Sequence, residues 1–128
     1  ALERADVLAV SAPLTPLTRG LIDGRRIDLL RPGGYLLVVS RGGIVDEGAL
    51  IAALEAGRLA GAGLDVVATE PLPPGNPLWD TPNLILTPHC SARSRQTRER
   101  VWTITTENIR RFVDGEPLTN VCDKRAGF

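Results

Sequence analysis

Tyr35-Leu36-Leu37-Val38-Val39 is a continuous apolar run, and the polar turn Ser40-Arg41-Gly42-Gly43 follows it directly. An unbroken apolar run of this length is typical of a strand buried on both faces of a parallel sheet. Pro32-Gly33-Gly34 interrupts the chain before the run, and the polar turn comes directly after it. The stretch therefore predicts a central strand that carries Ser40 and Arg41 at its carboxyl end.

Apolar runs on either side of this stretch predict three more strands, over residues 6–10, 60–67 and 84–86. Helices are expected between them, one over residues 23–30 and one that begins at Asp46, with Asp23 and Asp46 as N-caps. Strands that alternate with helices indicate an α/β fold with a parallel sheet and right-handed crossovers.

The last third of the chain predicts one long helix, from about Ser94 to Asp114. Its apolar positions recur at helical spacing, so we expect a buried stripe. The stripe consists of Val101, Trp102, Thr105, Asn108, Ile109, Phe112 and Val113. Before this helix, the proline-rich residues 68–82 predict a loop. Its apolar pair Leu78-Trp79 either packs on the sheet or forms a dimer contact.

Composition excludes several classes of protein. Fifteen basic residues balance fifteen acidic ones, which argues against nucleic acid or a membrane surface as a partner. The arginines at positions 93, 95, 98 and 100 could bind nucleic acid, but Glu99 among them favours a solvated helical face. No apolar run reaches the roughly 20 residues that a membrane span needs. Two cysteines and no signal-peptide pattern favour a cytoplasmic protein with reduced thiols.

Polar residues follow the predicted strands at the point where each one ends. Arg41 follows the second strand, Asp65 and Glu70 follow the third, and His89 follows the fourth. The carboxyl ends of parallel strands share one edge of the sheet, and ligands bind beyond that edge. We therefore expect these side chains to converge on one site.

This set of residues suits proton transfer at a keto or hydroxy acid. His89, the only histidine, titrates near neutral pH, and Glu70 could fix its tautomer. A planar Arg41 guanidinium could grip a carboxylate with two hydrogen bonds. Each residue alone also has an ordinary interpretation: a surface arginine, an exposed loop acid or a structural histidine. Asp65 could accept from an amide or hydroxyl, or cap the following turn.

Several ordered motifs resemble those of D-isomer-specific 2-hydroxyacid dehydrogenases. The similar stretches are Pro13-Leu14-Thr15-Pro16, Thr18-Arg19-Gly20-Leu21-Ile22, Ser40 to Glu47, Ala62-Gly63-Leu64-Asp65-Val66, Glu70-Pro71 and Leu86-Thr87-Pro88-His89. The resemblance covers nearly the whole chain. It implies hydride transfer between NAD or NADP and a small 2-hydroxy or 2-keto acid, and a homodimeric complete protein.

The resemblance also implies roles for single residues. Arg41 would grip the substrate, His89 would act as acid and base, and Glu70 would hold His89. Asp65 would bind the nicotinamide carboxamide. The cofactor site would be lined by Ala12, Val39, Ser40, Arg41, Asp65, His89 and Cys90. No metal site is expected. Ser11 stands where the family often has a histidine, which weakens one cofactor contact.

The glycine-rich phosphate-binding turn of this family is absent from the sequence, which contains no Met and opens on Ala1. We therefore expect an excerpt of a longer protein, the second half of a Rossmann-like doubly wound sheet. Residues 1–93 would complete a dinucleotide-binding domain, and residues 94–128 would be a crossing helix and a tail returning toward a substrate domain. Two alternatives remain open: a non-enzymatic, NAD-sensing, corepressor-like binding protein on the same scaffold, and an inactive fragment.

Overall fold

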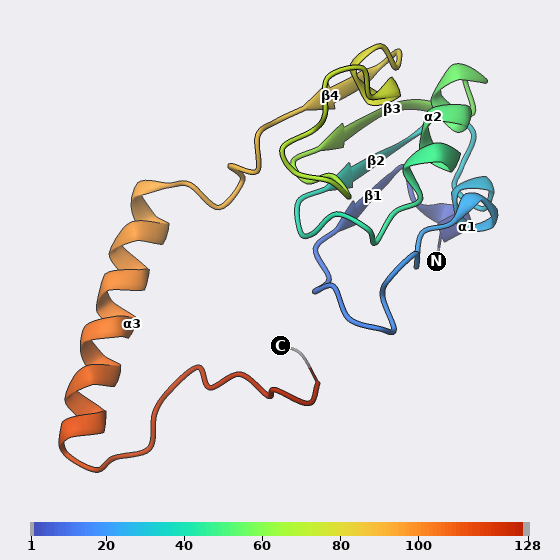
Figure 1. The fold of residues 1–128 in the computed structure, drawn as a ribbon. Helices are drawn as coiled ribbons and strands as arrows, with labels where there is room; N and C mark the ends of the chain where they lie inside the picture. The colour runs from blue at the N-terminus through green and yellow to red at the C-terminus, as the bar shows by residue number, and fades with distance from the viewer. Residues whose placement is uncertain (1, 127–128) are drawn as a thin grey trace. The chain divides into compact units, whose positions relative to one another are not determined.

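The structure, a computed structural model, describes residues 2–126 and divides the chain into two compact units, Ala1–His89 and Cys90–Phe128. The first unit contains a four-stranded sheet in which every neighbouring pair of strands is parallel (Figure 1). The strands follow the order of the sequence: β1 Val7–Val10, β2 Gly34–Val38, β3 Leu59–Leu64 and β4 Leu84–Leu86. The predicted parallel α/β sheet is confirmed, and the predicted domain division after residue 93 stays a prediction.

Two α-helices connect these strands, α1 (Gly24–Asp28) and α2 (Glu47–Glu55). Asp23 and Asp46 are their N-caps, as predicted, and each side chain accepts a hydrogen bond from a backbone N–H in the first turn. Single turns of 3₁₀ helix, η1 (Leu2–Arg4) and η2 (Pro77–Trp79), lie before β1 and inside the proline-rich loop.

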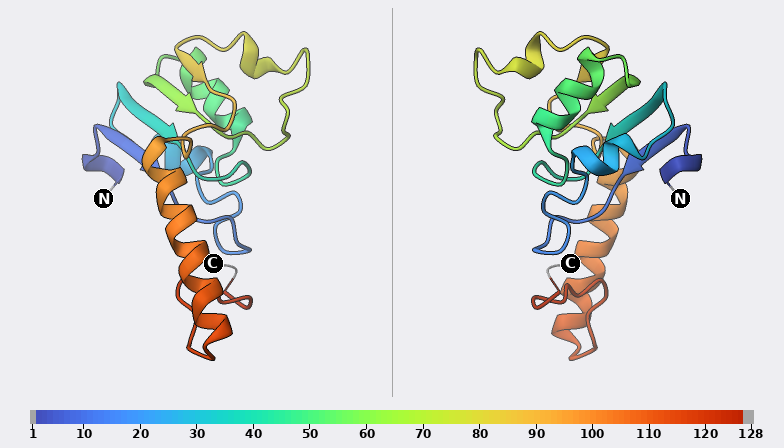
Figure 2. Two further views of the ribbon diagram at one scale, coloured as in Figure 1. Left: turned by 90° about the vertical axis from the view of Figure 1, so that its left-hand side faces the viewer. Right: turned by 90° about the vertical axis from the view of Figure 1, so that its right-hand side faces the viewer.

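Burial alternates along β2. Leu36 is fully buried and Val38 nearly so, whereas Tyr35 and Leu37 are exposed. The buried face of the sheet packs with α1 and α2, which lie on the same side of the strands (Figure 2). The expectation that this strand is buried on both faces is therefore wrong for the first unit. Within the described residues of this unit, both α-helices cover the same face of the sheet. The apolar side chains on the other face of the sheet are exposed.

Backbone hydrogen bonds hold the carboxyl ends of the strands level with one another. The residue directly after a strand donates its N–H to the last residue of the preceding strand in the sheet. These bonds run from Val39 to Val10, from Asp65 to Val38 and from Thr87 to Leu64. The third strand is shorter than predicted, since it ends at Leu64, and Asp65 is consequently the first residue beyond it.

The second unit contains helix α3 (Arg95–Val113), whose N-cap is Ser94. The predicted buried stripe is not found: none of the residues of α3 is buried, and Trp102 and Phe112 are 73% and 77% exposed. A stripe is buried only where a second apolar layer covers it. The segment after α3 binds the helix through polar groups instead, because the Asn108 amide pairs with the backbone of Thr119.

Candidate functional site

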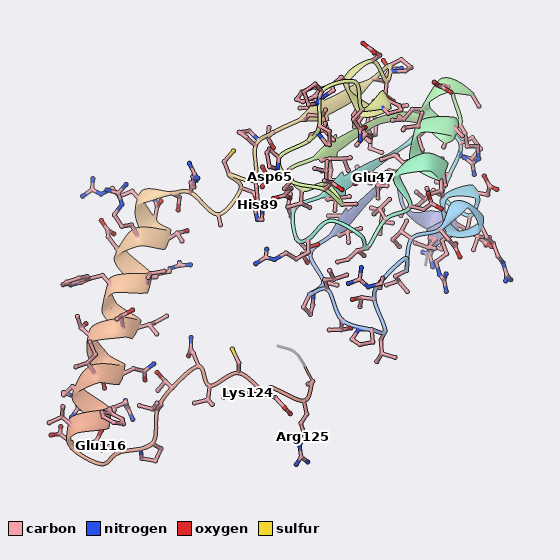
Figure 3. The ribbon with its side chains drawn as sticks, in the orientation of Figure 1. Glu47, Asp65, His89, Glu116, Lys124 and Arg125 are labelled. Atoms are coloured by element: carbon pink, nitrogen blue, oxygen red, sulfur yellow. The ribbon has the colours of Figure 1, made fainter. Side chains whose placement is uncertain are left out.

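The residues after the strands gather at the carboxyl edge of the sheet. Ala12 comes shortly after β1, Ser40 after β2, Asp65 after β3 and His89 after β4. Asp65 and His89 line the same cavity at this edge, and Figure 3 labels both side chains. Parallel pairing thus brings together side chains that are far apart in the sequence.

His89 and Glu70 form an ion pair at this edge. The Nδ1 atom of His89 lies 2.8 Å from Oε2 of Glu70. The second carboxylate oxygen, Oε1, accepts a hydrogen bond from the backbone N–H of Val67 at 3.2 Å. Glu70 is therefore held through both of its oxygens, one by the imidazole and one by its own loop.

The hydrogen bond from His89, more than any other contact, lowers the pKa of the Glu70 carboxyl below its ordinary value. Glu70 is thus ionised at neutral pH, and an ionised carboxylate can only accept hydrogen bonds. The proton between the two groups must therefore belong to Nδ1 of His89. The pair fixes one tautomer and leaves Nε2 as the ring nitrogen that can take up or release a proton.

The backbone at His89 is unusual, because its φ of 49° lies in the left-handed region. Its N–H donates to the carbonyl oxygen of Thr87, which closes a tight turn around Pro88. Residues other than glycine adopt such angles rarely, and strained positions of this kind gather at functional sites. The turn directs the histidine away from the path that a continuing strand would take.

Asp65 is 5% exposed, and its Oδ1 accepts a hydrogen bond from the Thr87 hydroxyl at 2.5 Å. This contact joins the end of β3 to the end of β4. A buried carboxylate at a strand end is a strong acceptor for an amide or hydroxyl of a ligand.

Arg41 is exposed at the end of β2, and its Nη1 donates to the carbonyl oxygen of Ser40 at 2.7 Å. Its positive charge contributes to the low pKa of Glu70. The guanidinium is consequently near enough to the ion pair for their fields to act on each other, and its remaining N–H groups can bind an anion.

A cavity of about 670 Å³ opens beside Asp65, Glu70 and His89, and Arg41 is not among the residues that line it. Its polar lining consists of Asp65, Glu70, Thr87 and His89, and its apolar lining includes Leu72, Trp79 and Leu86. Trp79 is 56% exposed and donates from Nε1 to the Pro73 carbonyl, whereas Leu78 is buried. Leu78 therefore packs in the core, as one of the two alternatives expected, and the dimer contact stays a prediction for the exposed Trp79.

The residues at this edge fit the carboxamide group of a nicotinamide dinucleotide. The Ser40 hydroxyl is buried and has no hydrogen-bond partner among the described residues. Asp65 adds a buried acceptor, and Val39 and Ala12 add apolar surface beside them. An amide that both donates and accepts would match this set. Cys90 is the first residue of the second unit, and its role at the cofactor stays a prediction.

Residues 1–91 match the family described as "D-isomer specific 2-hydroxyacid dehydrogenase, NAD binding domain". The match takes in the whole sheet and the site at its edge. The chain belongs to this family. It is thus a segment of an NAD-binding domain, as the motifs implied.

Members of the 2-hydroxyacid dehydrogenase family with curated functions are similar over most of the chain. A hydroxypyruvate reductase from Blautia hydrogenotrophica is 40% identical over 96% of this chain and 38% of its own length. An (S)-sulfolactate dehydrogenase from Chromohalobacter salexigens is 44% identical over 86% of this chain and 36% of its own length. The chain therefore spans little more than a third of these relatives.

Solved structures of the family are similar to this chain in both sequence and fold. A D-isomer specific 2-hydroxyacid dehydrogenase from Xanthobacter autotrophicus Py2, in complex with NADPH and MES, is 43% identical with a TM-score of 0.90, over 99% of this chain and 52% of that one. An NADPH-dependent glyoxylate/hydroxypyruvate reductase from Sinorhizobium meliloti, in complex with NADP and sulfate, is 37% identical with a TM-score of 0.90, over 99% of this chain and 41% of that one.

Two further features bear on the class of protein. Within residues 2–126, no helix is both long enough and apolar enough to cross a bilayer. In the same part of the chain, no group of three or more histidine, cysteine and acidic residues is placed to hold a metal ion.

Sequence reasoning did not assign Thr87 and Val67 to the site. Thr87 stands two residues before His89 and, like Asp65, directly follows a strand, which is a signal that could have found it. Val67 acts through its backbone N–H, and the identity of a side chain carries no signal for such a role.

Proposed function

We propose that this chain is part of an NAD- or NADP-dependent oxidoreductase that interconverts a D-2-hydroxy acid and the corresponding 2-keto acid. The observation that carries this proposal is the His89–Glu70 pair, 2.8 Å apart at the carboxyl edge of the sheet. An acid-base pair at this edge, in a chain of this dehydrogenase family, suits proton transfer beside a bound nicotinamide.

Arg41 grips the carboxylate of the substrate in this proposal. A guanidinium presents a planar fork that matches a carboxylate with two parallel hydrogen bonds. Within the described residues, Nη1 donates to the neighbouring Ser40 carbonyl, and the rest of the fork can bind the substrate. The charge of Arg41 thereby sets the class of substrate as a small organic acid.

His89 moves the proton. In reduction of the keto acid, Nε2 gives a proton to the carbonyl oxygen, and in oxidation it takes the proton of the hydroxyl group. Glu70 holds the ring through Nδ1 and stabilises the positive charge of the protonated imidazole. Arg41, Glu70 and His89 are thus the three residues that we assign to catalysis.

The cofactor would be held by Ala12, Val39, Ser40, Asp65 and the catalytic Arg41 and His89, with Cys90 added from the predicted set. Asp65 would accept from the nicotinamide carboxamide, and the unsatisfied Ser40 hydroxyl would pair with the same end. When bound, the nicotinamide ring supplies or accepts the hydride. For the complete protein we also propose a homodimer and a cytoplasmic location, and a sequence with only two cysteines is consistent with that location.

Steady-state assays on the complete protein test the proposal. With NADH and NADPH, each tried against several 2-keto acids, we expect reduction that His89→Ala lowers about 10²–10⁴-fold in kcat. Glu55→Ala, at the exposed end of α2, is the control and should leave the rate unchanged. Binding of the cofactor without turnover of any keto acid would contradict the proposal and favour the NAD-sensing binding protein.

A further inference from the structure

We propose that Glu47 is a positioning residue for the His89–Glu70 pair, acting through the turn that carries Glu70. The inference rests on the proposed function, because it assigns to Glu47 the alignment of a pair that the proposed reaction uses. The hydrogen bond of Glu47 is to the backbone of the turn and not to either member of that pair. Its effect is transmitted by the backbone of residues 67–70.

The decisive contact joins α2 to this turn. Oε1 of Glu47 accepts a hydrogen bond from the backbone N–H of Ala68 at 2.5 Å, across 21 residues of sequence. Glu47 is the first residue of α2, so its backbone is set by the helix, and its side chain is half-buried. A hydrogen bond from a backbone N–H to an ionised carboxylate is short and about twice as strong as a neutral one.

Ala68 lies inside the turn that Glu70 closes. Val67, directly before Ala68, donates its N–H to Oε1 of Glu70, and Oε2 of Glu70 pairs with His89. Three consecutive contacts therefore lead from α2 to the imidazole: Glu47 to Ala68, Val67 to Glu70, and Glu70 to His89. A shift of the backbone at Ala68 moves the carboxylate that orients the ring.

The turn is also held from the β2 side, since the backbone of Gly42 packs directly against Val67 and Ala68. Packing at Gly42 limits how near the turn can approach, and the Glu47 hydrogen bond limits how far it can withdraw. Glu47 is not needed to cap the helix, because Asp46 already accepts the hydrogen bond of the N-cap. Its contact with Ala68 is therefore separate from the capping of α2.

Two conservative variants separate the contact of Glu47 from its charge. Glu47→Gln removes the charge but keeps an oxygen at the same reach. Glu47→Asp keeps the charge at the start of α2 but shortens the side chain by one methylene group. The shorter side chain cannot reach the backbone N–H of Ala68, so the hydrogen bond is lost. Glu55→Asp makes the same chemical change at the exposed end of the same helix and is the matched control.

The first readout is the tautomer of His89 in the 128-residue chain, measured from the ¹⁵N shifts of the ring at a pH where the imidazole is neutral. The chain contains one histidine, so one pair of ring signals reports on the site. We expect the Nδ1–H form to dominate in the original chain, in Glu47→Gln and in Glu55→Asp. Glu47→Asp should shift the proton toward Nε2. An unchanged tautomer in Glu47→Asp, or the same shift in Glu47→Gln, would overturn the inference.

The second readout is the kinetics of the complete protein. Misplacement of a reacting group by about 1 Å can cost about 10²-fold in rate, so Glu47→Asp should lower kcat by about ten- to a hundredfold with little change in KM. Glu47→Gln should retain most of the kcat of the original protein. Equal rates for Glu47→Asp and the original protein would contradict the inference. If no variant reduces keto acids but the tautomer shifts as expected, the proposed function fails and the positioning role stands.

Discussion

Gly42 lies so close to Val67 that a Cβ atom on Gly42 would sit 1.9 Å from the Val67 carbonyl oxygen. The clash would be with backbone atoms, which cannot rotate away as a side chain can. Gly42, in the loop after β2, thus packs directly on the main chain of the loop after β3. This close approach requires glycine at the position directly after Arg41.

Gly42→Ala should therefore destabilise the chain by about 1–3 kcal/mol, because the loops must separate to admit a methyl group. Urea unfolding of the 128-residue chain measures this change. Gly48→Ala is the control: it lies in α2, where its new Cβ would meet only ordinary contacts, and it should stabilise by about 0.5–1 kcal/mol. Equal stability of Gly42→Ala and the original chain would show that the loops are not in contact.

Thr87→Val should weaken the link between β3 and β4. The variant keeps the shape of the side chain but removes the hydroxyl that donates to the buried Asp65 carboxylate. Loss of a hydrogen bond to a buried charged group costs about 1–3 kcal/mol. Thermal or urea unfolding gives the value. Thr106→Val, on the exposed surface of α3, should change the free energy of unfolding by no more than about 0.5 kcal/mol.

Neighbouring leucines in β2 should differ sharply in their contribution to stability. Leu36 is fully buried under the helices, and Leu37 is 41% exposed on the open face. Leu36→Ala should cost about 2–5 kcal/mol in free energy of unfolding, and Leu37→Ala no more than about 1 kcal/mol. Similar losses for the two variants in the 128-residue chain would show that the second face is also covered.

Arg41→Lys tests the proposed grip of Arg41 on the substrate carboxylate in the complete protein. Lysine keeps the positive charge but cannot form two parallel hydrogen bonds, so the loss falls on substrate binding. A hydrogen bond to a charged group is worth about 1.5–3 kcal/mol, which predicts a rise in KM of about ten- to a hundredfold with kcat less affected. A fall in kcat at constant KM would instead assign Arg41 to the transition state alone.

Stability should depend on pH through Glu70. Its pKa is lower in the folded chain than the ordinary value of 4.5, chiefly because His89 donates to it. The ion pair therefore stabilises the fold above pH 4.5, and this contribution is lost as the pH falls through the lower folded pKa. Both side chains are more than a third exposed, so the effect should be at most about 1 kcal/mol.

Urea unfolding of the original chain and of Glu70→Gln, from pH 7 down to about pH 3, measures this contribution as a difference. Glu107 and Glu116 also have lowered pKa values, but both proteins contain them and their effects cancel. The stability difference should shrink as the pH falls below 4.5 and Glu70 takes up a proton. A difference that does not change with pH would mean that the charge of Glu70 is not paired.

The sequence was sufficient to predict the parallel sheet, both aspartate N-caps and the edge on which Asp65 and His89 meet. These features arise from local patterns: an apolar run gives a strand, and parallel pairing puts strand ends side by side. The exposure of Leu37 and of Trp102 could not be predicted in this way. Burial of the second face of a strand or helix depends on which layers surround it, and a periodic pattern does not contain that information.

Contacts made by backbone groups also could not be predicted from the sequence. The hydrogen bonds from Val67 to Glu70 and from Ala68 to Glu47 use main-chain N–H groups, which every residue except proline possesses. No residue type marks them. The motif around Glu47 was visible in the sequence. Whether the Glu47 side chain can reach the N–H of Ala68 depends on how α2 and the loop after β3 are placed.

The hold on both oxygens of Glu70 has a consequence for the conformational entropy of the site. A glutamate side chain loses up to about 2 kcal/mol of rotamer freedom when it is fixed in one position. In this chain the loss occurs on folding, because Val67 and His89 restrain the two oxygens before any ligand arrives. A ligand that enters the site therefore meets an imidazole whose ring orientation is already selected, and no part of the ligand's binding free energy is consumed in ordering the carboxylate.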